Sequence, residues 1–167
     1  MLRSFGLAAS KLLAPDPAAV ETLIATLAEN GDWHADAVAL LAGGWRDQVT
    51  AAAAIAIARA GDAPIVEALW TAIDGASWVA PQLVAAALIA DPGFEPRAAD
   101  RLGSPARRPP KTIGALVHAY TRCPARRMPV VAQLGVHDRA MATEEARIGV
   151  RGVDGWLDYF AVSSRAS

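Results

Sequence analysis

The sequence has few of the residues that build disulfide-linked, β-rich or membrane-spanning proteins. Its one cysteine, Cys123, excludes an internal disulfide and favours a reducing compartment. β-Branched residues are sparse and no long run alternates between apolar and polar residues, so strands are not expected. No stretch of 18 apolar residues is free of charge and proline, which excludes a membrane-spanning helix. We therefore expect a cytoplasmic, all-α protein without a membrane partner.

Residue patterns typical of catalytic and cofactor sites are also missing. The histidines His34, His118 and His137 have no second histidine, cysteine or clustered acid at the spacing of a metal site. Neither a G-x-G-x-x-G motif nor a P-loop is present, so nucleotide binding has no support. Cys123 has no evident histidine to activate it, and we interpret it as a packed residue. We expect no enzyme activity, no cofactor and no metal ion.

The most abundant residue is alanine, which is the strongest helix former and lets helices approach closely. Prolines and glycines divide the alanine-rich chain at regular intervals, because Pro64, Pro96 and Pro129 follow one another at almost equal spacing. Long helices are predicted to begin near 17, 45, 77 and 109, and short helices near 33, 63, 95 and 128. A period of this length is typical of stacked helical repeats, which share one continuous core.

The repeat is clearest in residues 45–69, which read WRDQVTAAAAIAIARAGDAPIVEAL. This long alanine-rich helix, followed by Gly-Asp and a shorter leucine-bearing helix, resembles a bacterial HEAT-type repeat. The resemblance covers residues 17–135 and implies a short right-handed α-solenoid of about four helical pairs. Residues 1–16 are expected to form an N-terminal helix and turn of the same single domain. Residues 136–167 are expected to form a C-terminal cap, with a final helix over the open end of the stack. That helix holds an apolar cluster of Trp156, Leu157, Tyr159 and Phe160.

The net charge of −1 hides two regions of opposite sign. Residues 1–92 hold four basic and ten acidic side chains, whereas residues 93–127 hold eight basic and two acidic ones. Acidic residues fall mostly at helix starts and turns, where we expect them to line one rim and attract a cationic partner. These residues are Asp32, Asp36, Asp47, Asp62 and Asp74. The basic cluster is a solvated edge, a docking patch for an acidic protein or a phosphate-binding track. It comprises Arg97, Arg101, Arg107, Arg108, Lys111, Arg122, Arg126 and Arg127.

Tryptophan accounts for half of the ten aromatic residues. Trp45 and Trp78 begin equivalent helices of successive repeats, and we call the spacing between them the repeat offset. Each is interpreted either as packing between repeats or as an interface anchor, because tryptophan is enriched at binding hot spots. Trp33 and Trp70 have the same two interpretations.

These features predict a non-catalytic protein–protein interaction module. The HEAT-type resemblance implies an immunity or adaptor protein that binds and blocks one partner, and the acidic face would suit a basic toxin or enzyme. The predicted partner-binding residues are Asp32, Asp36, Asp47, Asp74, Trp33, Trp45, Trp78, Arg97, Arg101, Arg107 and Arg108. Two alternatives remain: a nucleic-acid-binding protein that uses residues 97–127, and an accessory subunit or helper of an enzyme. An apolar groove lined by Trp33, Trp70 or Trp78 would favour the helper.

Overall fold

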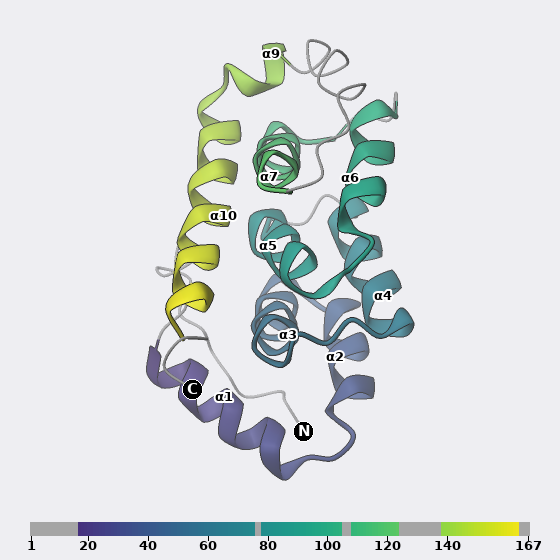
Figure 1. Ribbon diagram of the computed structural model, residues 1–167, viewed down its shortest axis with the longest axis vertical. Helices are drawn as coiled ribbons and strands as arrows, with labels where there is room; N and C mark the ends of the chain where they lie inside the picture. The colour runs from purple at the N-terminus through teal and green to yellow at the C-terminus, as the bar shows by residue number, and fades with distance from the viewer. Residues whose placement is uncertain (1–16, 76–77, 105–107, 124–137, 164–167) are drawn as a thin grey trace.

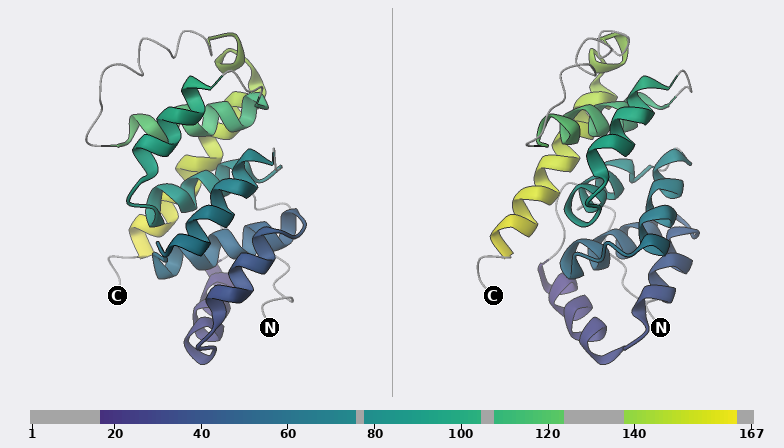
Figure 2. Two further views of the ribbon diagram at one scale, coloured as in Figure 1. Left: turned by 90° about the vertical axis from the view of Figure 1, so that its right-hand side faces the viewer. Right: turned by 45° about the vertical axis from the view of Figure 1, so that its right-hand side comes forward.

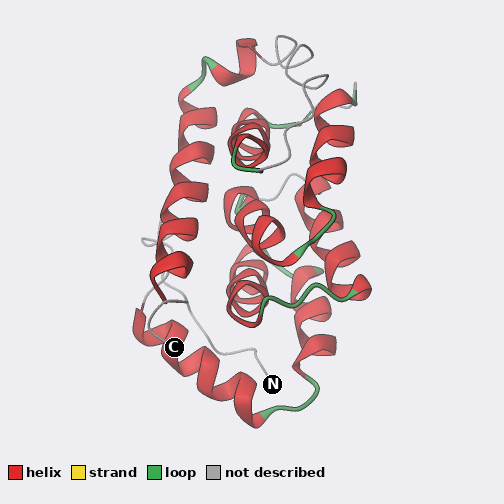
Figure 3. Ribbon diagram, in the orientation of Figure 1, coloured by secondary structure: helices red, strands yellow, loops and turns green. Residues whose placement is uncertain are grey.

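The computed structural model describes residues 17–75, 78–104, 108–123 and 138–163, which form helices and turns without a strand (Figure 1 and Figure 3). The prediction of an all-α chain is confirmed for these residues. The N-terminal helix expected in residues 1–16 and the short helix expected near residue 128 lie outside them. The helices are α1 (Pro17–Glu29), α2 (Trp33–Leu41), α3 (Trp45–Ala58), α4 (Ala63–Asp74), α5 (Ala80–Ala90), α6 (Phe94–Gly103), α7 (Pro110–Thr121), α9 (Asp138–Met141) and α10 (Glu144–Ser163).

Local sequence sets the helix boundaries. The Asp62 carboxylate accepts a hydrogen bond from the Ile65 backbone N–H at 3.4 Å, and Pro64 lies in the first turn of α4, as expected for a capped start. Gly44 precedes α3 and donates its N–H to the Asp47 carboxylate at 3.3 Å. The expected starts near 17, 33, 45, 63, 95 and 109 agree with the observed helices to within one residue. The helix expected from residue 77 instead begins at Ala80.

The helices form three layers (Figure 1 and Figure 2). The middle layer holds α3, α5 and α7, with α5 packed between the other two. One face of this layer is covered by α2, α4 and α6, which pack on α3, α5 and α7 respectively. The opposite face is crossed by α10, which packs on α7 and α5, while α1 packs on α3.

The middle layer is buried on both faces, which explains its alanine content. Ala51 to Ala54 of α3 and Ala85 to Ala87 of α5 are fully buried. Small side chains at these positions let three layers of helices approach closely, and a helix covered on both faces needs no polar stripe. Larger side chains of this layer, such as Leu83 and Leu116, are fully buried in the same apolar core.

The C-terminal helix does not cap the end of the stack as predicted. A final helix is present, but α10 lies across the sides of α7 and α5 (Figure 1). The reason is the apolar face that the middle layer leaves open opposite α2, α4 and α6, against which α10 buries Trp156 and Phe160. Close approach is possible because Gly149 faces the α7 backbone and Gly152 faces the Pro81 ring. Although α10 is 20 residues long, no helix in the described ranges is apolar enough over its length to span a bilayer.

Candidate functional site

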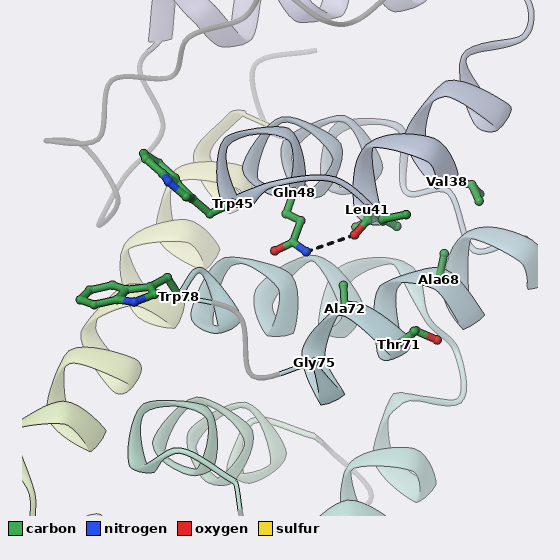
Figure 4. A pocket seen from close by; sticks show the side chains of 10 residues that line it. Val38, Leu41, Trp45, Gln48, Ala68, Thr71, Ala72, Gly75 and Trp78 are labelled. Atoms are coloured by element: carbon green, nitrogen blue, oxygen red, sulfur yellow. Dashed lines mark hydrogen bonds between the residues drawn. The ribbon is translucent and has the colours of Figure 1, made fainter.

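An open apolar groove of about 550 Å³ lies where α2 and α4 end and α3 begins (Figure 4). We call this region the groove end of the molecule. Its polar groups are few, and one of them is already bonded, because the Gln48 side-chain amide donates to the Leu41 carbonyl at 3.1 Å. The groove is lined by Val38, Leu41, Ala42, Trp45, Gln48, Ala68, Thr71, Ala72, Gly75 and Trp78.

Two helical stripes form most of the groove. Residues 38, 41 and 42 line it from α2 and its end, and residues 68, 71, 72 and 75 line it from α4 and its end. Both sets follow the three- and four-residue spacing that places side chains on one face of a helix. Because the α4 stripe consists of alanine, threonine and glycine, α4 contributes no long side chain to the space between the two helices.

Trp45 and Trp78 lie together at one side of the groove (Figure 4). Trp78 is 75% exposed, whereas Trp45 is half-buried and packs on the core. Each indole carries a cation: the Arg46 guanidinium lies 4.1 Å from the Trp45 ring centroid, and the Lys111 ammonium lies 4.1 Å from that of Trp78. Burial lowers the pKa of Lys111, and the Glu145 charge partly opposes this shift.

The predicted acidic residues divide between two ends of the helices, so the single acidic rim is not formed. Asp62 caps α4 and lies 3.3 Å from the ring of His34, which places the beginnings of α2 and α4 together. Asp32 precedes α2 at this end, and Asp36 lies in its first turn. Asp47 and Asp74 lie instead at the groove end, because α3 begins there and α4 ends there. The sequence places acids at helix starts, but the direction of each helix decides which starts are neighbours.

The predicted basic cluster pairs with carboxylates of the acidic region. Arg97 of α6 binds Glu67 of α4 at 2.7 Å, which lowers the pKa of the Glu67 carboxyl and raises that of Arg97. Arg101 and Arg108 both bind Asp74, at 2.8 and 3.2 Å, and their side chains are only 16% and 15% exposed. These cations therefore join α6 and the loop that follows it to α4. Arg107 lies outside the described residues.

The repeat offset relates this ionic bridge to the groove. One offset earlier in the sequence, Arg101 and Arg108 correspond to Ala68 and Gly75, and their shared partner Asp74 corresponds to Leu41. Long charged side chains lie between α4 and α6, whereas the residues one offset earlier, between α2 and α4, are two small residues and a leucine. The offset can be read from the sequence. The sequence does not show that Arg101 and Arg108 bind Asp74, and this pairing is what distinguishes the two spaces.

The remaining predicted tryptophans belong to the core or its edge. Trp70 is 1% exposed, donates its indole N–H to the Asp91 carboxylate at 2.7 Å, and packs against Phe94. Trp33 is half-buried against the core and lies edge-on to His34, with ring centroids 4.3 Å apart. Of the four tryptophans considered as anchors, Trp45 and Trp78 are the pair that the structure brings to one groove.

The Cys123 thiol and the His118 ring, in and just after α7, are both bonded within the fold. Burial raises the pKa of the Cys123 thiol, which disfavours the thiolate needed for nucleophilic chemistry. His118 is bound to Asp154 of α10 at 2.7 Å, and Arg122 binds the same carboxylate, so this cluster joins α7 to α10. Nowhere in the described ranges do three or more histidine, cysteine or acidic side chains gather as a metal site would require.

The chain matches no protein-family model, no curated protein and no solved structure.

Proposed function

We propose that this protein is a non-catalytic protein–protein interaction module that docks a segment of one partner in the groove between α2 and α4. The observation that carries the proposal is Trp78, a large side chain that is 75% exposed beside an open apolar groove. Tryptophan is enriched among residues that dominate binding energy, and burying one indole removes a large apolar area from water. The volume of about 550 Å³ lies in the range of binding pockets.

The architecture that we propose for this module is a short right-handed solenoid of HEAT-like pairs. The sequence groups α1 with α2, α3 with α4, α5 with α6, and α7 with the helix predicted near residue 128. The helices that pack closely as pairs are shifted by one, because α2 lies on α3, α4 on α5 and α6 on α7. The repeat offset between Trp45 and Trp78 supports this proposal, as do the two rows of helices in sequential order. In such a solenoid the corresponding helices of successive pairs, such as α2 and α4, lie side by side. A groove can then form between them.

Within this proposal, an immunity or adaptor role means that one partner is bound stoichiometrically and blocked. The acids expected to attract a basic toxin or enzyme include helix caps and ion-paired groups, such as Asp62 and Asp74. We therefore assign the principal contacts to the groove rather than to an acidic rim. One observation favours the helper alternative: Trp78 lines an apolar groove, as that alternative predicted. In that case the partner is an enzyme.

Nucleic-acid binding through residues 97–127 is disfavoured by the charge pairing. A phosphate track needs cations that can exchange counterions for phosphates. Arg97, Arg101 and Arg108 are instead bound to carboxylates of the same chain, and two of them are largely covered.

The test is affinity capture from a lysate of the source cell, with the intact chain and two variants as bait. Trp78→Ala removes the exposed indole at the groove, and Ile24→Ala removes the other large apolar side chain that is exposed among the described residues, which lies on α1. We expect one protein to be retained stoichiometrically by the wild type and by Ile24→Ala, and to be lost with Trp78→Ala. Retention by Trp78→Ala, or recovery of nucleic acid that disappears with added salt or nuclease, would contradict the proposal.

A further inference from the structure

The cations at the groove end fall into two groups. Arg101 and Arg108 are both bound to Asp74. Arg46 and Lys111 form no ion pair with a carboxylate of the described residues, and each lies instead on a tryptophan face at the groove. The nearby acids make other contacts: Asp47 accepts the Gly44 N–H, and Glu145 acts on Lys111 as a neighbouring charge without forming an ion pair with it.

The surface beside these cations is built from helices and favours recognition through side chains, since its unbonded backbone groups are confined to the helix ends that meet at the groove. It is built from α2, α3 and α4, whose main-chain N–H and C=O groups are bonded within helices except at the ends. A partner strand would find no sheet edge there to pair with. A helical segment satisfies its own backbone and can lay an apolar stripe along Ala68 and Ala72, where small residues allow close approach.

From these observations we infer that the partner segment is an acidic amphipathic helix. Its apolar stripe lies between α2 and α4, and carboxylates beside that stripe bind Arg46 and Lys111. This rests on the proposed function and deepens it by naming the chemistry of the partner. The repeat offset identifies the space that the partner fills, because Arg101 and Arg108 of this chain fill the next space along, between α4 and α6. Carboxylates that reach both cations also pack against the edges of Trp45 and Trp78, so charge and apolar contacts act at the same place.

The probe is a displayed library of helical peptides of about four turns, with an apolar stripe fixed and the flanking positions randomised. We expect selection on the intact protein to enrich aspartate and glutamate at the flanking positions. The selected peptides should lose binding to Trp78→Ala. One selected peptide is then synthesised beside a twin in which lysine replaces each acidic residue, and both are titrated against the protein by fluorescence anisotropy.

Two charge reversals on one helix provide the matched comparison. Arg46 lies at the start of α3 beside the groove, and Arg59 lies at its far end; both side chains are exposed, so Arg46→Glu and Arg59→Glu change the net charge equally. Arg46→Glu is expected to weaken the acidic peptide at least about fivefold and to improve the lysine twin, whereas Arg59→Glu changes either by less than about twofold. Lys111→Gln, a milder change, should weaken the acidic peptide in the same direction. Far-ultraviolet circular dichroism confirms that each variant is helical.

The possible outcomes distinguish failure of the acidic-helix inference from failure of the proposed docking function. Peptides that depend on Trp78 but show no acidic preference, or equal effects of Arg46→Glu and Arg59→Glu, would overturn the acidic partner and leave the groove as a docking site. A library that yields no peptide dependent on Trp78 would overturn both.

Discussion

Asp74 and Arg101 form a two-pronged ion pair that joins the end of α4 to α6. The Arg101 guanidinium donates to the carboxylate through Nε at 3.1 Å and through Nη2 at 2.8 Å. The same guanidinium lies 4.3 Å from the Trp70 ring centroid, so it is held by a carboxylate and an aromatic face together. Arg108 is a second cation bound to Asp74. This arrangement makes the basic cluster part of the fold.

Replacing Asp74 should therefore destabilise the protein more than replacing an acid in an exposed pair. Asp74→Ala leaves two largely covered guanidinium groups without their carboxylate, and we expect a loss of about 1–2 kcal/mol in the free energy of unfolding. Glu67→Ala removes an acid whose side chain is 64% exposed. Its loss should cost clearly less than that of Asp74, because solvent screens an exposed ion pair. Urea unfolding followed by circular dichroism measures both, and equal losses would show that Asp74 is no more than a surface ion-pair residue.

A second stabilising contact is the hydrogen bond from Trp70 to Asp91. The Asp91 carboxylate is 8% exposed and also accepts the Gly93 N–H at 2.7 Å. Trp70→Phe removes the indole donor and part of the buried ring, so we expect a loss of about 2–3 kcal/mol. Trp78→Phe changes an exposed ring and should cost less than about 0.5 kcal/mol. Comparable losses in the two variants, measured by thermal or urea unfolding, would contradict the structural role given to Trp70.

The helical elements were accessible from the sequence because their signals are local. Asp62 with Pro64 predicts the start of α4, and the alanine run after Trp45 predicts α3, from chemistry within a few positions. The side of the stack that α10 covers could not be predicted in the same way. That depends on which face of α5 and α7 remains apolar after α4 and α6 have packed, and it requires the whole fold.

Part of the candidate site could likewise be predicted from the sequence, and part of it required the whole fold. The spacing of Trp45 and Trp78 predicted that the two residues hold equivalent positions at helix starts. The structure places both at one groove, but Trp45 begins α3 and is half-buried, whereas Trp78 precedes α5 and is 75% exposed. The charge asymmetry pointed instead to separate acidic and basic surfaces. It was misleading because Arg97, Arg101 and Arg108 meet Glu67 and Asp74 across the α4–α6 space, although these partners are far apart in sequence.

The contact between α10 and α7 gives a third prediction. A Cβ atom added at Gly149 would collide with the Lys111 carbonyl of α7, whereas one added at Gly31 would meet no atom within 4 Å. Alanine is favoured over glycine inside a helix by about 1 kcal/mol, so Gly149→Ala would stabilise an isolated α10. In the folded protein the collision should dominate and give a net loss of about 1–3 kcal/mol. Gly31→Ala is the space control and should change stability by less than about 0.5 kcal/mol. Stabilisation by Gly149→Ala, measured by urea unfolding, would show that α10 does not pack this closely on α7.

Cys123 supplies a fourth prediction, on pH. Burial raises the pKa of its thiol above that of a free cysteine, and the Glu95 charge adds to this shift. The folded protein therefore keeps the thiol proton at a pH where the unfolded chain has begun to lose it. The contribution to stability is fully present below the pKa of the unfolded thiol, and it is lost as the pH rises through the higher pKa of the folded state.

Two measurements check the sign of this shift. The reaction of native Cys123 with iodoacetamide should be slow at pH 8, and its rate should rise at a higher pH than in the guanidinium-unfolded chain, because the thiolate is the reactive form. The difference in unfolding free energy between wild type and Cys123→Ala should also shrink as the pH is raised above about 8.5, the ordinary pKa of a cysteine. Identical pH profiles for the native and unfolded thiols would mean that Cys123 is open to solvent at the end of α7. That result would contradict the burial of Cys123 just after α7.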